Sequence, residues 1–260
     1  MITIGIDSGS LATKGVVLGD DKKILGSAID LTGGRSRKSG ERVYHQVLDR
    51  AGLSEQDVAF VVTTGYGRDN LPFSGKNVTE ITCHAAGVHF LFPDVATILD
   101  IGGQDSKVIR IGNGGRVENF IMNDKCAAGT GRFLEVIAKA LEVRLEDLGA
   151  ISQQTDKNVE ISSMCTVFAE TEVVSLVAED TPVPEIVRGV HNVIVERGEI
   201  LLGKIGLVEP VAMSGGVALN IGVVKALEKR LGLELRIAEN PQLTGALGAA
   251  VIARNLMEKR

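Results

Sequence analysis

The sequence predicts an α/β protein built on two similar sheets, and three observations carry this prediction. Apolar, strand-like segments alternate with segments of helical periodicity along the 260 residues. A short pattern of Asp, Gly and Lys occurs twice, each time between strand-like segments. Glycine is in excess: 31 of the 260 residues are glycine, which is nearly twice the usual share of about 7%.

Composition restricts the classes of partner. With 44% apolar and 23% charged residues, the chain suits one large domain or two small ones with a sizeable core. A net charge of -5, no Trp and two Tyr argue against nucleic acid as a partner. No apolar run approaches the ~20 residues that span a bilayer, so no membrane partner is expected. Three thiols, an odd number, without a signal peptide indicate the reducing cytoplasm.

The duplicated pattern is the first element along the chain. Residues 1–18 read as a strand, a glycine turn and a second strand, and residues 97–111 repeat this order. In both copies Gly follows the Asp by two residues and Lys follows it by seven, as Asp7, Gly9 and Lys14 and as Asp100, Gly102 and Lys107. We interpret the match as an internal duplication.

The later elements follow from periodicity and turn residues. A third glycine turn at residues 213–217 follows a short strand at 211–212. Helices are predicted at residues 131–141, 166–178, 220–231 and 243–257, and the last is rich in small residues that allow close packing. Residues 112–115 are interpreted as a hairpin turn. Residues 33–42 (GGRSRKSGER) are interpreted as a polar, basic loop, either solvated or used for docking.

Glycine turns of this kind can bind phosphate. Without a Cβ, the backbone N–H groups can converge on an anion. The carboxylates of Asp7, Asp100 and Asp105 could hold Mg²⁺ or orient a water for attack on a γ-phosphate. A single such turn is more often an ordinary strand connection, but three together favour a nucleotide cleft. The sequence contains neither a P-loop motif nor a G-x-G-x-x-G after the first strand, which disfavours P-loop NTPases and Rossmann dehydrogenases.

Two cysteine segments narrow the assignment. The duplicated turns with a late Gly-Gly turn resemble the superfamily of actin, sugar kinases and heat-shock chaperone ATPases. The segments NDKCAAGTGRF (residues 123–133) and SSMCTVFAE (residues 162–170) resemble those of ATP-dependent activators of (R)-2-hydroxyacyl-CoA dehydratases and of the related benzoyl-CoA reductase ATPase subunits. The resemblance covers essentially the whole chain.

The resemblance implies a fold and its domains. It implies two duplicated actin-like (ribonuclease H-like) domains with a nucleotide cleft between them. Domain I would comprise residues 1–94 with 244–260, and domain II residues 95–243, carrying both cysteine segments.

The resemblance also implies binding residues. Asp7 and Asp105 would be catalytic, with Mg²⁺ as the metal of ATP/ADP binding. The positions that match nucleotide-binding residues of the family are Ser10, Leu11, Ala12, Thr13, Lys14, Gly103, Gln104, Gly215, Gly216, Val217 and Gln242. Leu11 departs from a position that is often Thr in the family.

The cysteines are the candidate metal ligands. A [4Fe–4S] cluster usually takes four thiolates, and this chain has three cysteines. Cysteine count alone favours three unrelated reduced thiols, because no C-x-x-C is present. The resemblance reverses that interpretation: Cys126 and Cys165 match the family's ligands, and two from each subunit would hold one cluster across a homodimer. Cys83 is expected in the core, and a metal site of Cys83, His84 and His89 is disfavoured because the two histidines do not share a helix face.

The implied activity is ATP-dependent electron transfer. Ferredoxin or flavodoxin would reduce the cluster, and ATP hydrolysis would drive delivery of one electron to a partner iron–sulfur enzyme, such as a 2-hydroxyacyl-CoA dehydratase or a different reductase. Two alternatives remain on fold alone: an iron-free small-molecule kinase of the same superfamily, and a chaperone-like module that uses ATP as a clamp.

Overall fold

The chain folds into two compact units. The structure, a computed structural model, describes residues 1–73, 75–124, 126–162 and 165–259. One unit contains Met1–Ile98, Ile109–Asn119 and Ala238–Arg260, and the other contains Leu99–Val108 and Phe120–Ile237. The domain limits expected from the sequence, 1–94 with 244–260 and 95–243, stay a prediction. Among the described residues, no helix has both the length and the apolar character needed to cross a membrane.

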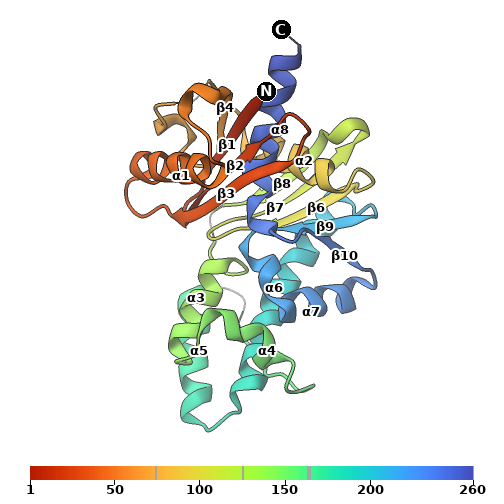
Figure 1. Cartoon of the computed structure of the whole chain (residues 1–260). Helices are drawn as coiled ribbons and strands as arrows, with labels where there is room; N and C mark the ends of the chain where they lie inside the picture. Colours follow the sequence, from red (N-terminus) through yellow and green to blue (C-terminus); the bar gives the residue numbers. More distant parts are fainter. Residues whose placement is uncertain (74, 125, 163–164, 260) are drawn as a thin grey trace. The chain divides into compact units, whose positions relative to one another are not determined.

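The first unit is a five-stranded mixed sheet with helices on both faces. Its strand order is β3-β2-β1-β4-β5, with β1 antiparallel to β2 and parallel to β4 (Figure 1). The strands are β1 (Ile2–Ser8), β2 (Ala12–Leu18), β3 (Ile24–Leu31), β4 (Val58–Thr64) and β5 (Lys76–Asn77). The helices are α1 (Ser36–Ala51), α2 (Glu80–Leu91) and α8 (Thr244–Glu258).

Alternation along β1 assigns each face of this sheet to a different helix. Ile4 and Ile6 belong to the core cluster that contains Val43 and Val47 of α1. Between them, a Cβ on Gly5 would overlap the backbone of α8. Because successive strand residues point to opposite faces, even-numbered residues of β1 face α1 and odd-numbered residues face α8.

The last helix packs as closely as its small residues predict. A Cβ on Gly248 of α8 would overlap the carbonyl group of Cys83 in α2, and one on Gly87 of α2 would overlap the carbonyl oxygen of Thr244. Glycine at both positions lets the two helix backbones approach without a side chain between them.

The second sheet has the strand order β10-β9-β6-β7-β8. The strands are β6 (Thr97–Ile101), β7 (Ser106–Gly112), β8 (Arg116–Asn123), β9 (Val211–Ser214) and β10 (Leu235–Ile237). The helices that follow in the second unit are α3 (Gly131–Ala140), α4 (Leu148–Ser152), α5 (Thr166–Ala178), α6 (Val183–Ile205) and α7 (Ile221–Leu231). Strands β7 and β8 are joined through residues 113–115, as the predicted hairpin requires.

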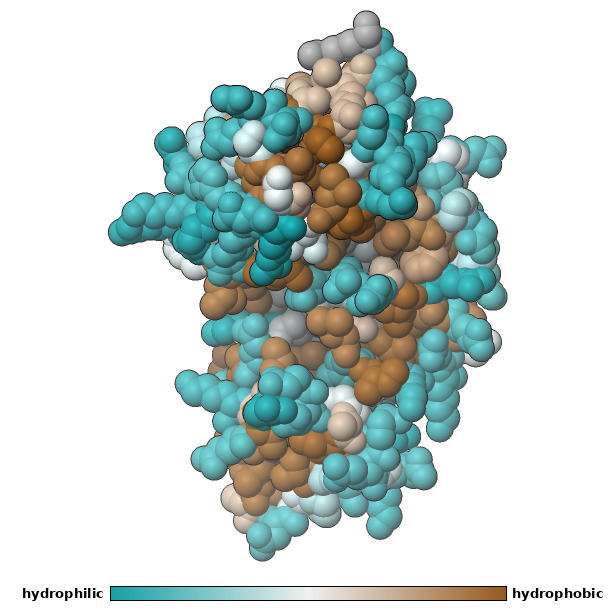
Figure 2. Space-filling view, in the orientation of Figure 1, coloured by the Kyte–Doolittle hydropathy of each residue, from teal (hydrophilic) through white to brown (hydrophobic). Residues whose placement is uncertain are grey.

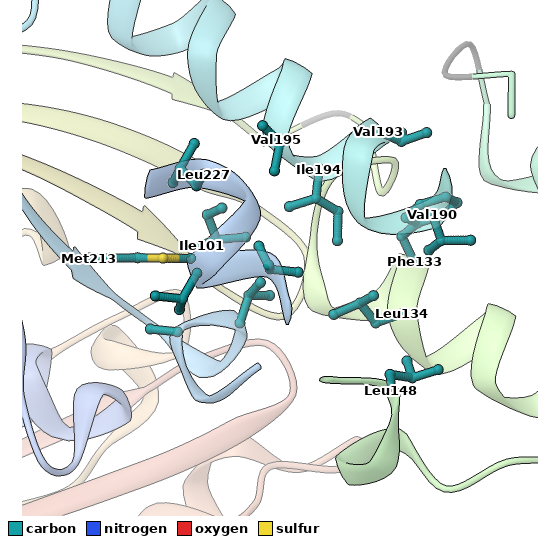
Figure 3. Packing of buried hydrophobic residues seen from close by; sticks show 14 of the residues in the cluster. Ile101, Phe133, Leu134, Leu148, Val190, Val193, Ile194, Val195, Met213 and Leu227 are labelled. Carbon is teal, nitrogen blue, oxygen red and sulfur yellow. The ribbon is translucent and has the colours of Figure 1, made fainter. Parts of the chain in front are cut away.

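The long helix α6 connects the strands of the second unit to a group of helices. Figure 1 shows α3, α4 and α5 gathered around one end of α6, away from β9 and β10. Phe133 and Leu134 of α3 lie in one buried cluster with Val190 and Ile194 of α6 (Figure 3). The same cluster contains Ile101 and further strand residues. The apolar core is therefore continuous from the sheet to the helices that follow the cysteine segments.

One predicted element is wrong. Residues 33–42 were expected to form a loop, but α1 begins at Ser36. The first turns of α1 are polar, so its sequence shows no helical periodicity there. The apolar side of the helix starts later, with Val43, Tyr44 and Val47 buried against the sheet. Tertiary burial of that side outweighs the weak local preference of the first turn.

Candidate nucleotide-binding turns and cysteine loops

Each half of the duplicated pattern forms an aspartate–lysine ion pair across a strand hairpin. Asp7 and Lys14 are register partners on β1 and β2, and Lys14 Nζ lies 3.1 Å from Asp7 Oδ2. In the second copy, Lys107 Nζ lies 2.9 Å from Asp100 Oδ2. The seven-residue spacing predicted from the sequence therefore corresponds to a cross-strand charge pair in both copies.

The backbone of the two turns repeats as well. Gly9 N donates to Ala12 O at 3.1 Å, and Gly102 N donates to Asp105 O at 2.9 Å. Both bonds run from the residue two after the aspartate to the residue five after it. The two hairpins thus share one turn geometry as well as one charge pair.

The repeat extends to a third segment, of which sequence reasoning found only the second copy. Gly65 follows β4 with φ of 84°, and Gly215 follows β9 with φ of 85°. A Cβ at either glycine would overlap the backbone of the residue that follows the aspartate, which is Ser8 in one copy and Ile101 in the other. Only the Gly215 turn was predicted. The available signal was a hydroxyl residue and a glycine directly after an apolar strand, as Thr64-Gly65 and as Ser214-Gly215.

The second turn carries more negative charge than the first. Lys107 Nζ also lies 2.6 Å from Asp105 Oδ2, so one ammonium group faces two carboxylates. Ser214 Oγ donates to Asp100 Oδ1 at 2.7 Å. The side chains of Asp100 and Lys107 are 2% and 4% exposed, whereas that of Asp105 is 24% exposed. Asp105 is therefore the carboxylate that solvent or a divalent cation can reach.

The predicted residues of the first turn divide into backbone and side-chain roles. Ser10 is exposed, and Leu11 and Ala12 are half-buried. The hydroxyl of Thr13 is buried and lies 2.9 Å from the hydroxyls of both Thr32 and Ser39. Its side chain is thus engaged with the α1 side of the sheet, so this position can reach a phosphate only through its backbone.

The remaining predicted positions lie in short connecting turns. Gly103 is half-buried and Gln104 is exposed, between β6 and β7. Gly215 precedes the short 3-10 helix η5 (Gly216–Leu219), where Val217 is buried. Gln242 is half-buried in η6 (Pro241–Leu243), directly before α8.

Hydrogen bonds connect the second turn to the Cys126 segment. Cys126 lies in the connection between β8 and α3, five residues before α3 begins. Gly131 N donates to Gly102 O at 2.9 Å, and Arg132 N donates to Gly103 O at 2.8 Å. The first N–H groups of a helix have no carbonyl partner within the helix. In α3, two of them are satisfied by carbonyl oxygens of the candidate nucleotide turn.

Thr130 closes the same connection from the cysteine side. Its Oγ1 lies 2.7 Å from Ala127 O and 3.2 Å from Gly103 O. Thr130 N also donates to Ala127 O at 3.0 Å. The residue after Cys126 and the candidate phosphate turn are therefore held by one buried hydroxyl.

The second cysteine precedes a helix with an apolar, exposed surface. Cys165 occupies the N-cap of α5, and no side chain caps this helix. Thr166 Oγ1 is buried and has no hydrogen-bond partner among the described residues. Val167 and Phe168 of α5 are 64% and 62% exposed, in a region where Figure 2 shows hydrophobic patches. Lys125, Ser163 and Met164 of the two motifs lie outside the described residues.

The three thiols differ in accessibility. Cys126 and Cys165 are free and half-buried, whereas Cys83 is free and fully buried. Burial raises the pKa of the Cys83 thiol to about 12. A buried thiol with a raised pKa is a weak nucleophile, and Cys83 has the core position expected from the sequence.

Comparison with known proteins assigns the chain to a family. The 2-hydroxyisocaproyl-CoA dehydratase activator of Clostridioides difficile is 46% identical over 97% of this chain and 95% of its own length. The activator of lactoyl-CoA dehydratase of Anaerotignum propionicum is 44% identical over the full length of both chains. The solved structure of the activator of the 2-hydroxyisocaproyl-CoA dehydratase from Clostridium difficile, with bound ADPNP, covers 100% of this chain and 96% of its own at 45% identity, with a TM-score of 0.94.

The two sheets and their glycine turns confirm the predicted actin-like fold class. The model of the BadF/BadG/BcrA/BcrD ATPase family matches residues 4–253, which include both Asp–Lys hairpins and both cysteine segments. The protein belongs to the BadF/BadG/BcrA/BcrD ATPase family.

Proposed function

We propose that this protein is an ATP-dependent one-electron donor that activates an iron–sulfur partner enzyme. The observation that carries the proposal is the hydrogen-bonded connection between the Gly102–Gly103 turn and the Cys126 segment. In an ATPase, a change at that turn reaches a candidate metal ligand through only a few residues. Transfer of phosphate to a small molecule does not require a connection between the nucleotide turn and a cysteine.

The cysteines fit a shared iron–sulfur cluster. A [4Fe–4S] cluster takes four thiolates, and each chain offers two accessible ones, Cys126 and Cys165. A two-fold homodimer supplies the full set. The N-terminus of α5 at Cys165 adds free N–H groups and the positive end of a helix dipole, which favour a thiolate and an anionic cluster. When bound, the cluster would accept and release one electron.

The glycine turns would bind ATP and Mg²⁺. Backbone N–H groups at Ser10 and Gln104 are free of side-chain obstruction, because Gly9 and Gly103 precede them. The net charge of Asp100, Lys107 and Asp105 together is negative when all three are ionised, which suits a divalent cation near Asp105. Asp105, the most accessible carboxylate of its turn, would orient the water that attacks the γ-phosphate.

Nucleotide state would be transmitted through α3. Binding or loss of the γ-phosphate shifts the Gly102–Gly103 turn, and Gly131 and Arg132 are bonded directly to it. Helix α3 packs on α6 and α5, so the segments of Cys126 and Cys165 would move together. ATP binding would thereby favour the subunit arrangement that delivers the electron.

The partner belongs to a class rather than a single enzyme. The relatives named above activate dehydratases of two different 2-hydroxyacyl-CoA substrates at nearly equal identity to this chain. We therefore propose a 2-hydroxyacyl-CoA dehydratase or a related reductase as partner, with ferredoxin or flavodoxin as the electron source.

The proposal is tested by anaerobic purification and chemical analysis. We expect about four iron and four sulfide per dimer, lost in Cys126→Ser and in Cys165→Ser. Cys83→Ala is the matched control, because that thiol is buried and protonated, and it should keep the iron. Iron-free wild-type protein that still binds ATP would contradict the proposal and favour the small-molecule kinase.

A further inference from the structure

Two carbonyl groups of the first glycine turn are held by one residue, Thr32. This residue directly follows the edge strand β3 and is 8% exposed. Its Oγ1 donates to Gly9 O at 2.7 Å, and its backbone N donates to Leu11 O at 2.9 Å. Gly9 and Leu11 lie on either side of Ser10, so Thr32 holds the turn both before and after this residue.

These two bonds set the direction of two peptide groups. A trans peptide group is planar, and its C=O and N–H point in opposite directions. The oxygens of Gly9 and Leu11 face Thr32. The N–H groups of the same two peptide groups belong to Ser10 and Ala12, and they therefore point away from Thr32. Phosphate binding in this turn is assigned above to the Ser10 N–H, so Thr32 sets the orientation of that group.

The Thr32 hydroxyl belongs to a buried group of three hydroxyls. Thr13 Oγ1 lies 2.9 Å from both Thr32 Oγ1 and Ser39 Oγ. Ser39 Oγ also donates to Ser36 O at 3.0 Å within α1. A carbonyl oxygen can only accept, so Thr32 gives its single hydroxyl proton to Gly9 O, and Ser39 gives its own to α1. The proton of Thr13 serves one of its two neighbours, and the bond from Thr32 to the turn does not depend on it.

The second turn is also held through its carbonyl groups. Gly102 O and Gly103 O accept from N–H groups at the start of α3, and Thr130 Oγ1 lies 3.2 Å from Gly103 O. Thr130 comes between β8 and α3, and Thr32 comes between β3 and α1. Each turn is thus held from the segment that follows the third strand of its own sheet along the chain. In the first turn, the side chain that holds it is that of Thr32.

We propose that Thr32 is a positioning residue for ATP, which holds the N–H groups of the first turn in the direction that a phosphate group requires. The inference rests on the phosphate-binding role that the proposed function gives to this turn. The Thr32 hydroxyl is buried and bonded to Gly9 O, so it acts through the turn rather than by touching the nucleotide. Without this hydroxyl, the peptide group between Gly9 and Ser10 loses its fixed direction and must be ordered when ATP binds.

The test measures ATP hydrolysis by the anaerobically purified protein over a range of ATP concentrations. Thr32→Val keeps the shape of the side chain but removes the hydroxyl, and it should raise the KM for ATP by about tenfold. The value of kcat should stay nearly constant, because the turn contacts phosphate in the ATP complex and in the transition state alike. Thr32→Ser and Thr32→Ala form a second pair of small side chains. The serine variant should keep the wild-type KM, and the alanine variant should show the raised KM.

Ser39→Ala is the matched control. It removes a buried hydroxyl of the same group, but that hydroxyl does not contact the turn. Urea denaturation should show a loss of stability in both Ser39→Ala and Thr32→Ala. Only Thr32→Ala should raise the KM for ATP. A purely structural role of Thr32 would instead move both variants together.

The outcomes separate this inference from the proposed function. An unchanged KM in Thr32→Val, or a KM raised as much by Thr32→Ser as by Thr32→Ala, would overturn the inference alone. So would an equal rise in KM in Ser39→Ala. Iron content should stay at the wild-type level in every variant. Wild-type protein that does not hydrolyse ATP would overturn the proposed function and this inference together.

Discussion

The two Asp–Lys hairpins have the same turn hydrogen bond and differ in the side chains that surround their ion pairs. The first, at Asp7 and Lys14, balances one carboxylate with one ammonium group. The second, at Asp100 and Lys107, adds the carboxylate of Asp105 and the hydroxyl of Ser214. Only in the second hairpin do turn carbonyls accept hydrogen bonds from the N–H groups of the helix that follows a cysteine segment. The two copies therefore share one turn geometry, and the second copy has in addition a second carboxylate and hydrogen bonds to a helix that the first copy lacks.

The largest expected difference between the hairpins is in stability. Lys107→Met leaves two carboxylates without their cation in a buried site, so we expect a loss of about 3–5 kcal/mol in the free energy of unfolding. Lys14→Met removes one pair whose lysine side chain is 17% exposed, and it should cost clearly less. Urea denaturation of both variants measures this. Equal losses in the free energy of unfolding would show that the second carboxylate, Asp105, does not make the second hairpin more dependent on its lysine.

Catalysis should separate the hairpins next. Asp105→Asn keeps the side-chain size but removes the most accessible carboxylate of the second turn. We expect ATP turnover to fall by about 100-fold, the range typical for losing one preorganised electrostatic group. Iron content should stay unchanged, because the Asp105 carboxylate is paired with Lys107 and is not one of the candidate cluster ligands. Loss of iron together with ATPase activity would contradict this division between nucleotide and cluster residues.

The mechanical connection is tested by a matched pair of hydroxyl deletions. Thr130→Val removes the hydroxyl that joins the Cys126 segment to Gly103, whereas Thr13→Val removes a buried hydroxyl bonded to Thr32 and Ser39 near the first turn. Each should cost about 1–3 kcal/mol of stability. Only Thr130→Val should lower ATP-driven electron delivery to a partner, by about tenfold at nearly constant ATPase rate. Comparable loss of electron delivery in both variants would place the coupling elsewhere.

What the sequence could predict was local, and what it missed depends on distant segments. The Asp–Gly–Lys spacing identified both hairpins because the whole unit lies within eight residues. The limits of α3 and α5 followed from helical periodicity and were close to the observed ones. By contrast, Gly65 gains its role only because β4 lies beside β1, and Thr130 gains its role from contact with Gly103. The start of α1 was missed because its apolar residues lie later in the helix.

The smallest expected effect concerns the residues behind the third glycine turn. His191 of α6 is buried, and burial lowers its pKa to about 4, with the nearby charge of Arg188 contributing. Asn220 Oδ1 accepts from Gly222 N and Val223 N, so its amide group faces His191 Nε2 as a donor at 3.2 Å. The imidazole must therefore accept at Nε2, and protonation there would place two donors against each other.

This arrangement gives a pH dependence with a definite sign. Because the folded pKa lies below the unfolded value of about 6.5, the contribution of His191 to stability is complete above pH 6.5 and is lost as pH falls toward 4. At pH 5.5 the loss should be about 1–2 kcal/mol, measured by urea denaturation against pH. His191→Gln keeps a polar group beside Asn220 but cannot titrate, and its stability should lose this part of the pH dependence. An unchanged pH profile in that variant would assign the acid sensitivity to titrating groups other than His191.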